Sequence, residues 1–203
     1  MTHLTILFMR HGQTDWNKAG RWQGHADIPL NKTGRQQAEA LCRRLKSWPI
    51  ETIYTSDLQR CVQTAVPLAN ELGLEPIKTQ LWRERNVGDF SGMTGEQARE
   101  QYPEIWARAV RGMIDPPNGE PFADVQTRAW RAFESVADAH SEGMVAVVSH
   151  GGFLHAMLAQ VMGIDPGIYG RFSMRGNTGL SIVEVNDRGP VVTRLNDTSH
   201  LEN

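Results

Sequence analysis

Two histidines and two arginines stand directly after apolar segments that are typical of β-strands. Arg10 and His11 follow one such segment near the start of the chain, and His150 follows another. Arg60 comes after a third segment, in the first turn of a predicted helix, where free N–H groups and the helix dipole favour an anion. Ligands of open α/β sheets gather beyond the carboxyl ends of the strands, so we expect these four side chains to converge there.

This set of side chains suits a phosphate group better than a metal ion. Guanidinium groups bind phosphate oxygens through two parallel hydrogen bonds, whereas a divalent cation would be repelled by Arg10 beside its supposed ligand His11 and would need carboxylates nearby. A neutral imidazole can attack phosphorus through one ring nitrogen while a hydrogen-bond acceptor, often a backbone carbonyl, holds the other nitrogen. The residues therefore predict a phosphate site without a metal.

A reaction at this site also needs an acid for the leaving oxygen, and Glu84 is the candidate. It follows the predicted strand at 75–79, in a loop-like and partly apolar stretch that favours the protonated carboxyl group. Taken singly, each of these residues has an ordinary structural explanation, such as a polar cap after a strand or a solvated ion pair. Their joint occurrence favours a catalytic site over these separate structural roles.

The composition argues against several classes of protein. The chain has 203 residues, of which 40% are apolar, which is enough for one well-buried core, so we expect one domain. A formal net charge of -2 argues against binding to nucleic acid. The longest apolar runs, at 6–9 and 144–148, are too short to cross a bilayer, and the first residues lack the features of a signal peptide.

The two cysteines, Cys42 and Cys61, fall inside helical patterns and form no Cys-x-x-Cys motif. We interpret them as small buried apolar residues rather than as a disulfide or a metal site. Together with the absence of a signal peptide, they predict a protein of the reducing cytoplasm. We expect no membrane partner, and either a monomer or a homodimer.

Hydrophobic periodicity predicts strands and helices that alternate along the chain. The predicted strands cover residues 3–9, 52–55, 75–79, 144–149, 179–185 and 190–196. The predicted helices cover residues 33–48, 56–72, 95–112, 121–141 and 152–162. Strands that alternate with helices predict an α/β sandwich around a parallel or mixed sheet.

Local signals predict where two of these helices begin. Thr33 with Gln36 has the pattern of a capping box, and Ser56 with Gln59 has the same pattern at the next helix. Pro67 lies inside that second helix, where a proline predicts a kink because its ring clashes with the preceding turn.

Six sequence motifs occur in an order that is typical of one known family. They are Arg-His-Gly-Gln-Thr-Asp-Trp-Asn at 10–17, Gln-Gly at 23–24, Asp-Ile-Pro-Leu-Asn-Lys-Thr-Gly at 27–34, Thr-Ser-Asp-Leu-Gln-Arg-Cys-Val-Gln-Thr-Ala at 55–65, Leu-Trp-Arg-Glu at 81–84 and Val-Ser-His-Gly-Gly at 148–152. The ordered set spans nearly the whole chain and resembles the histidine phosphatase superfamily, in its phosphoglycerate-mutase-like branch. Within that branch the chain is similar to the small, broad-specificity phosphatases.

The resemblance implies a fold and a domain organisation. Members of this family fold as a three-layer α/β/α sandwich with a mostly parallel central sheet and a helical insertion that covers the site as a lid. For this chain we expect a single histidine phosphatase domain over residues 1–203, with the lid at about residues 86–122.

The resemblance also implies a mechanism. His11 would be phosphorylated and then hydrolysed, with Glu84 as the proton donor and later as the base for water. Phosphoryl transfer depends mainly on positioning and on charge stabilisation, so no cofactor is expected.

Further residues take binding roles in the same resemblance. Arg10, Arg60 and His150 would hold the transferring phosphoryl group, and Asn17 would bind one of its oxygens. Additional contacts to the substrate are expected from Gln23, Gly24 and Gly151.

One motif departs from the family pattern. Members commonly carry Trp/Phe-Glu-Gly a few residues after the acid, whereas this chain has Gly-Asp-Phe-Ser-Gly at 88–92, with Ser91 where the glutamate falls. Either Asp89 supplies the missing carboxylate or the position is only structural, and the sequence leaves both readings open.

The sequence favours a phosphatase over a mutase. A mutase must return the phosphoryl group to a substrate before water arrives, which needs a longer lid and extra basic contacts. This chain is short and carries Arg-Asn-Val-Gly at 85–88, where the mutases have Arg-His-Tyr-Gly. We predict a phosphomonoesterase that hydrolyses small phosphorylated metabolites. A cofactor-dependent phosphoglycerate mutase and a catalytically silent relative that binds phosphorylated ligands are the alternatives.

Overall fold

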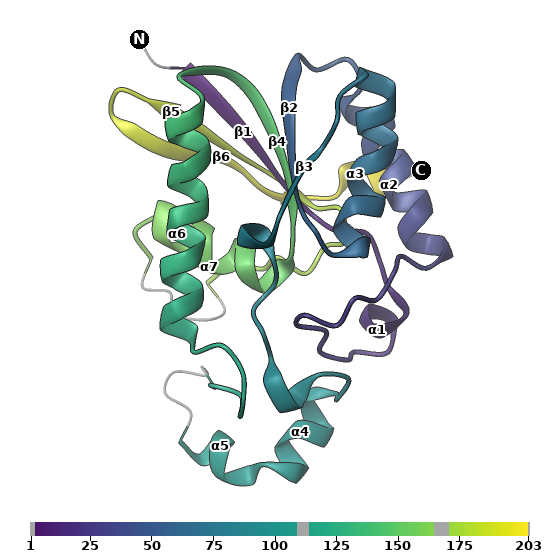
Figure 1. The fold of residues 1–203 in the computed structure, drawn as a ribbon, viewed down its shortest axis with the longest axis vertical. Helices are drawn as coiled ribbons and strands as arrows, with labels where there is room; N and C mark the ends of the chain where they lie inside the picture. The colour runs from purple at the N-terminus through teal and green to yellow at the C-terminus, as the bar shows by residue number, and fades with distance from the viewer. Residues whose placement is uncertain (1–2, 109–113, 165–170, 203) are drawn as a thin grey trace.

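A six-stranded sheet forms the centre of the computed structural model, which describes residues 3–108, 114–164 and 171–202 (Figure 1). The strand order is β3-β2-β4-β1-β5-β6. The strands are β1 (His3–Arg10), β2 (Ile50–Ser56), β3 (Ile77–Thr79), β4 (Glu142–Ser149), β5 (Leu180–Asn186) and β6 (Gly189–Asp197). Strands β1 to β4 pair in parallel, whereas β5 pairs antiparallel with both β1 and β6. The sheet is therefore mostly parallel, as expected.

Helices cover both faces of this sheet. On one face lie α2 (Lys32–Leu45) and α3 (Gln59–Leu72), and on the other lie α6 (Phe122–Ala139) and α7 (Gly151–Val161) (Figure 1). The remaining helical segments of the described residues are α1 (Asp15–Lys18), α4 (Gly95–Gln101), α5 (Pro103–Ala107), η1 (Gln80–Trp82), η2 (Gly88–Phe90) and η3 (Ser199–Leu201). The α/β/α layering that the sequence predicted is confirmed.

The two apolar cores follow from the alternation of side chains along the central strands. In β1, Leu4, Ile6 and Phe8 belong to the core under α6 and α7, whereas Leu7 and Met9 belong to the core under α2 and α3. Successive side chains of a strand point to opposite faces of a sheet, so a strand covered on both faces is apolar almost throughout. This explains why the longest apolar runs of the sequence became central strands.

Two helix starts differ from the sequence prediction. The cap of α2 is Asn31, whose side chain accepts a hydrogen bond from the N–H of Gly34 at 2.9 Å, rather than Thr33. Helix α3 begins at Gln59 without a cap from its own chain segment, because the Oδ1 of Asp27 accepts the Gln59 N–H at 2.7 Å. The hydroxyl group of Ser56, the predicted cap, accepts only a long hydrogen bond from the N–H of Leu58 at 3.4 Å, and its shorter contact, at 2.9 Å, is with His150.

Other boundaries shift for equally local reasons. The predicted strand at 75–79 is reduced to β3, and α3 continues across Pro67. The predicted helix at 95–112 is two helices, because Pro103 cannot continue α4 and instead occupies the first turn of α5. Residues 109–112 of that prediction lie outside the described residues.

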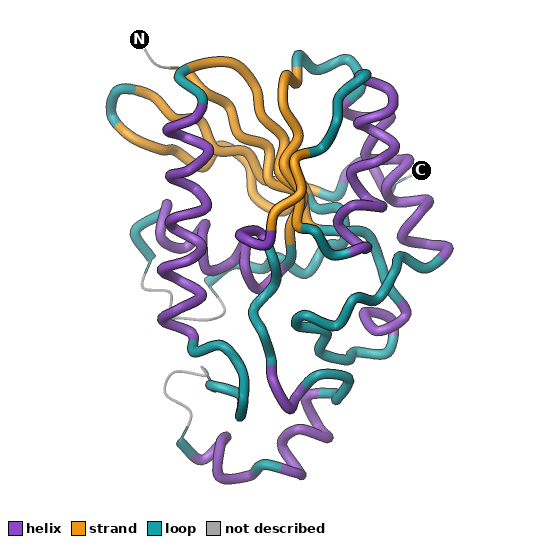
Figure 2. Tube along the Cα trace, viewed as in Figure 1, coloured by secondary structure: helices purple, strands orange, loops and turns teal. Residues whose placement is uncertain are grey.

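The segment predicted as a lid extends away from the sheet, below the carboxyl ends of the parallel strands, and is joined by long loops (Figures 1 and 2). Helices α4 and α5 enclose a small apolar core of their own, with Val87, Phe90 and Ala98 buried. That this segment serves as a lid stays a prediction. Among the described helices, none has the length and apolar character needed to span a bilayer.

Candidate active site

The register of the sheet brings the two histidines together. Arg10 pairs with Ser149 at the ends of the parallel strands β1 and β4, and the N–H of His11 donates to the Ser149 carbonyl at 2.9 Å. The next residue after β4 is His150, whose ring centroid lies 5.2 Å from that of His11. Both side chains are buried. The expected convergence at the carboxyl edge of the sheet is therefore present.

Hydrogen bonding fixes the tautomer of His11. Its Nδ1 lies 2.7 Å from the carbonyl oxygen of Gly12, which can only accept, so Nδ1 carries the hydrogen and Nε2 keeps its lone pair. Burial, followed by the positive charges of Arg60 and Arg10, holds the pKa of His11 well below its usual range. The imidazole is therefore neutral near pH 7, with one nitrogen fixed and the other available.

Arg60, in the first turn of α3, is fully buried and ties several segments together. Its Nε donates to the Nδ1 of His150 at 3.1 Å, and its other nitrogens donate to the carbonyls of Ala26 at 2.6 Å and Gly24 at 2.8 Å. Because a guanidinium group only donates, the Nδ1 of His150 must accept. The Nε2 of His150 therefore carries a hydrogen and donates to the Ser56 hydroxyl at 2.9 Å.

These contacts explain the charge state of His150 and the position of Ser56. Burial, followed by the charge of Arg60, holds the pKa of His150 well below its usual range. Sequence reasoning treated Ser56 only as a helix cap, although it lies inside the Thr-Ser-Asp motif that precedes Arg60. The structure shows that its hydroxyl group orients the second histidine.

Arg10 leaves one donor without a partner. Its Nη1 donates to the carbonyl of Met174 at 3.4 Å and, over a shorter distance, to that of Arg175. Its Nε is buried and has no hydrogen-bond partner among the described residues. An unpaired buried donor on a cation is costly, and a phosphate oxygen would satisfy it. This nitrogen is the most direct structural sign of an anion site.

Glu84 lies in polar surroundings rather than in the partly apolar ones that the sequence predicted. Its Oε1 accepts the N–H groups of Phe153 at 2.8 Å and Arg85 at 2.9 Å, and its Oε2 accepts the N–H of Gly152 at 3.0 Å. The prediction was wrong because the loop carries Glu84 to the first turn of α7, where free N–H groups bind a carboxylate. The carboxyl group is held rigidly beside the two histidine-bearing strands.

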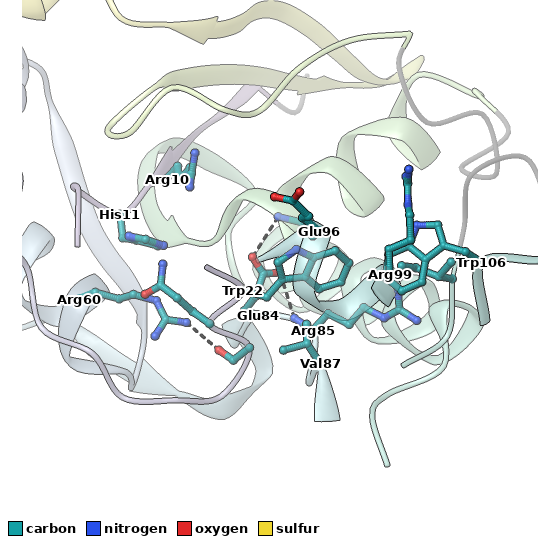
Figure 3. A pocket seen from close by; sticks show the side chains of 15 residues that line it. Arg10, His11, Trp22, Arg60, Glu84, Arg85, Val87, Glu96, Arg99 and Trp106 are labelled. Atoms are coloured by element: carbon teal, nitrogen blue, oxygen red, sulfur yellow. Dashed lines mark hydrogen bonds between the residues drawn. The ribbon is translucent and has the colours of Figure 1, made fainter. Parts of the chain in front are cut away.

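A cavity of about 820 Å³ connects these residues with the predicted lid (Figure 3). Arg10, His11 and Arg60 lie at one end of it, and Arg99 and Trp106 lie at the other. The residues that line this cavity include three further predicted site residues, which are Gln23, Gly24 and Glu84. Gly151 lines a second cavity of about 540 Å³ that shares Arg10 and Glu84 with the first.

Two predicted site residues are placed differently from this group. His150 is fully buried and contacts Arg60, so it acts on the cavity through that neighbour. Asn17 belongs to the capping box of α1, where its Oδ1 accepts from the N–H of Thr14 at 3.1 Å, and it is not among the cavity-lining residues. A contact between Asn17 and phosphate stays a prediction.

The residues of the divergent motif have structural contacts. Both carboxylate oxygens of Asp89 lie 3.1 Å from the Nδ2 of Asn118, within the predicted lid. The hydroxyl group of Ser91 donates to the carbonyl of Gln23 at 3.5 Å. Of the two readings that the sequence left open, these contacts favour the structural one.

Arg128 is a contributor that sequence reasoning missed. From α6 its guanidinium group donates to the carbonyls of Leu81 at 3.1 Å, Arg83 at 2.8 Å and Glu84 at 3.2 Å, and it forms an ion pair with Glu120 at 2.7 Å. It thereby holds the backbone of the loop that carries the candidate acid. On an amphipathic helix such an arginine is typical of the solvated face, so no sequence signal distinguished it.

The donor set does not resemble a metal centre. Among the described residues, no three histidine, cysteine, aspartate or glutamate side chains lie close enough to hold an ion together. Cys61 lies next to the histidines, but burial raises the pKa of its thiol, so it is not a ready thiolate ligand.

Comparisons with known proteins agree with this geometry. Residues 6–198 match the family model of the histidine phosphatase superfamily (branch 1). The chain is 33% identical to Phosphoserine phosphatase 1 of Hydrogenobacter thermophilus over 97% of this chain and 93% of that protein. It is 32% identical to a 2,3-bisphosphoglycerate-dependent phosphoglycerate mutase of Brucella melitensis over 96% and 94% of the two chains. The solved structure of Bacillus stearothermophilus YhfR matches with a TM-score of 0.89 at 32% identity, over 98% of this chain and 99% of that one.

The sequence resemblance is thus confirmed over nearly the whole chain, and the relatives include both phosphatases and mutases. The ordered motifs bring Arg10, His11, Arg60 and Glu84 to one cavity at the carboxyl edge of a mostly parallel sheet, with His150 buried against Arg60. The chain belongs to the histidine phosphatase superfamily, branch 1.

Proposed function

We propose that this protein is a metal-independent phosphomonoesterase that acts on small phosphorylated metabolites through a phosphohistidine on His11. The observation that carries the proposal is the state of His11, whose Nδ1 is held by the Gly12 carbonyl at 2.7 Å and whose pKa is lowered by burial and by Arg60. A neutral imidazole between two guanidinium groups combines a nucleophile with charges that stabilise a transferring phosphoryl group.

In the first step the lone pair on the Nε2 of His11 attacks phosphorus, and the bond between phosphorus and the ester oxygen breaks. Glu84, whose oxygens accept three N–H groups in the free protein, binds a proton before this step and gives it to the leaving oxygen. The unpaired Nε of Arg10 is placed to donate to a phosphoryl oxygen, and the charge of Arg60 lowers the energy of the anionic transition state.

In the second step a water oxygen attacks the phosphohistidine. The bond between phosphorus and nitrogen breaks, its electron pair returns to the Nε2 of His11, and the carboxylate of Glu84 accepts the proton from water. Inorganic phosphate then leaves. The same carboxyl group serves as acid and as base, and the N–H groups of Gly152 and Phe153 hold it in place for both steps.

The names of the relatives support hydrolysis, and they also leave transfer of the phosphoryl group to a substrate, as in a mutase, as the competing activity. Phosphoserine phosphatase 1 hydrolyses an ester by its name, whereas the Brucella relative is named a mutase. The sequence after Glu84 departs from the mutase pattern, which supports the hydrolase. A mutase would isomerise 3-phosphoglycerate only with the bisphosphoglycerate primer and would release little phosphate.

The experiment is rapid quench with a phosphorus-labelled ester, with and without EDTA. We expect acid-labile label on the parent protein within the first turnover, none on the His11→Ala variant, and phosphate release that EDTA does not change. Full turnover by His11→Ala would refute the covalent mechanism. Loss of activity with EDTA would refute metal independence, and primer-dependent isomerisation without phosphate release would replace the phosphatase by a mutase.

A further inference from the structure

The cavity extends well beyond the residues that would bind phosphate. From Arg10 and His11 it continues along the predicted lid, where Arg85, Glu96 and Arg99 line it together with four apolar side chains (Figure 3). The apolar side chains are Trp22, Val87, Trp106 and Ile114, which we call the apolar wall. An ester whose phosphate lies at Arg10 and His11 and whose alcohol part extends into this larger cavity meets the apolar wall.

The apolar wall is held in place by packing behind it. The indole of Trp22 meets the ring of Phe90 edge-on at 5.5 Å between centroids, and Phe90 lies 5.4 Å from the ring of Trp106. Phe90 itself is fully buried. Backbone hydrogen bonds from Trp22 to Met93 at 2.9 Å and from Gly92 to Trp22 at 2.8 Å join the loop after α1 to the lid segment. Packing and hydrogen bonds therefore hold both indole rings in fixed positions that face the cavity.

The polar groups near the apolar wall are already engaged or lie at its rim. Arg85 donates to the Glu120 carbonyl at 2.8 Å and pairs with Asp115. The exposed Arg99 stands with its guanidinium carbon 5.9 Å from the ring of Trp106, and the exposed Glu96 lies one helical turn before it. A polar alcohol would leave the indoles wet, and at this end of the cavity its exposed partners would be Glu96 and Arg99.

The volume of the cavity also favours a substrate with a large alcohol part. Pockets that enclose a drug-sized ligand measure about 300–1,000 Å³, and this cavity of about 820 Å³ lies in the upper part of that range. A three-carbon phosphoacid would fill only a small part of it. Flat, rigid aromatic surfaces bind rings at little cost in side-chain entropy.

We propose that the alcohol part of the preferred substrate carries a large apolar group, namely an aromatic ring that packs on Trp22 and Trp106. The inference rests on the proposed phosphatase function and names its substrate class. The shared phosphate end binds every ester equally, so discrimination between esters arises at the apolar wall.

The test compares phosphate esters of primary alcohols, whose leaving oxygens have similar reactivity. We expect kcat/KM for 3-phenylpropyl phosphate to exceed that for n-propyl phosphate and for phosphoserine by about tenfold or more, as apolar groups in fitted pockets discriminate. The ratio of the phenylpropyl to the propyl value is then measured in Trp106→Ala and in Trp22→Leu, and we expect it to fall at least about fivefold in each.

Trp130 on α6 provides the matched control. Its ring stacks on Phe133 at 5.4 Å, away from the cavity, so Trp130→Ala removes an indole without touching the apolar wall. The ratio should keep its parent value in this variant. Because a ratio is compared within each protein, partial loss of folded enzyme does not imitate the effect.

Three outcomes would overturn the inference. The first is a parent protein that prefers phosphoserine to the phenylpropyl ester, above all if Arg99→Gln removes that preference. The second is a ratio that both tryptophan variants leave unchanged. In these two cases label on His11 would show that the phosphatase proposal survives. The third is absence of label on His11 with every ester, which refutes the phosphatase proposal and this inference with it.

Discussion

Replacing Gly34 by alanine tests how closely α2 supports the loop that carries His11. A Cβ atom at Gly34 would lie 2.1 Å from the carbonyl oxygen and 2.8 Å from the nitrogen of Gln13, two residues beyond the candidate nucleophile. In the reverse direction, a Cβ atom at Gly12 would lie 2.6 Å from the Gly34 carbonyl oxygen. These are backbone atoms, so no side-chain rotation relieves the clash, and the helix or the loop must move.

The size of the effect follows from two opposing contributions. Forcing extra atoms into a packed site costs about 1–3 kcal/mol, and more where only the backbone can yield. The better helix propensity of alanine returns at most about 1 kcal/mol. Because the clash at Gly34 is with backbone, the cost lies at the upper end, and the net loss of about 2 kcal/mol lowers Tm by roughly 4–8 °C, since each kcal/mol shifts Tm by about 2–4 °C at this chain length.

The assay is thermal unfolding together with kcat for p-nitrophenyl phosphate. Gly95→Ala is the matched control, since Gly95 also begins a helix but its added Cβ atom would meet nothing nearer than the Trp22 indole nitrogen at 3.9 Å. We expect the Tm of Gly95→Ala to equal or exceed that of the parent, while Gly34→Ala loses both Tm and kcat. A Gly34→Ala protein as stable and as active as the parent would refute the proposed role of this contact.

Three further predictions concern charge. Burial holds the pKa of His11 and of His150 below the value of about 6.5 in the unfolded chain. Below about pH 6.5 the unfolded chain therefore binds protons that the folded protein excludes. As the pH is lowered through this range, the free energy of unfolding falls by up to about 2.7 kcal/mol per pH unit. Urea titrations at several pH values measure this slope, and an unchanged slope in His11→Asn would contradict it. Arg128→Met removes the hydrogen bonds that hold the loop carrying Glu84. We expect hydrolysis of alkyl phosphates to slow by about tenfold or more, while hydrolysis of p-nitrophenyl phosphate, whose leaving group needs no acid, keeps its rate. Equal losses of rate on both esters would indicate a structural role for Arg128. The ion pair with Arg44 at 2.6 Å holds the pKa of Asp197 below its usual range. Asp197→Asn weakens this contact, and we expect the free energy of unfolding in urea at pH 7 to fall by about 1–3 kcal/mol. An unchanged free energy of unfolding would refute this account.

Much of the fold was predictable because it depends on local periodicity. The runs in β1 and β4 are apolar at every position, which is typical of strands covered on both faces, and the helices carry their apolar residues at spacings of three and four. Helix starts were less predictable. Ser56 has the residue type and spacing of a cap, but its hydroxyl group binds His150, and Asp27 from another segment replaces it at the start of α3.

The sequence by itself determined the family and identified Arg10, His11, Arg60 and Glu84, since an ordered series of motifs is preserved along one chain whatever its three-dimensional contacts. Only the tertiary structure decided what each of these groups can do. The Gly12 carbonyl fixes the tautomer of His11, Arg60 orients a histidine 90 positions away, and the Nε of Arg10 is left without a partner among the described residues. Such contacts depend on strand register and on helix packing, which bring distant residues within hydrogen-bond distance and which no local pattern of residue types encodes.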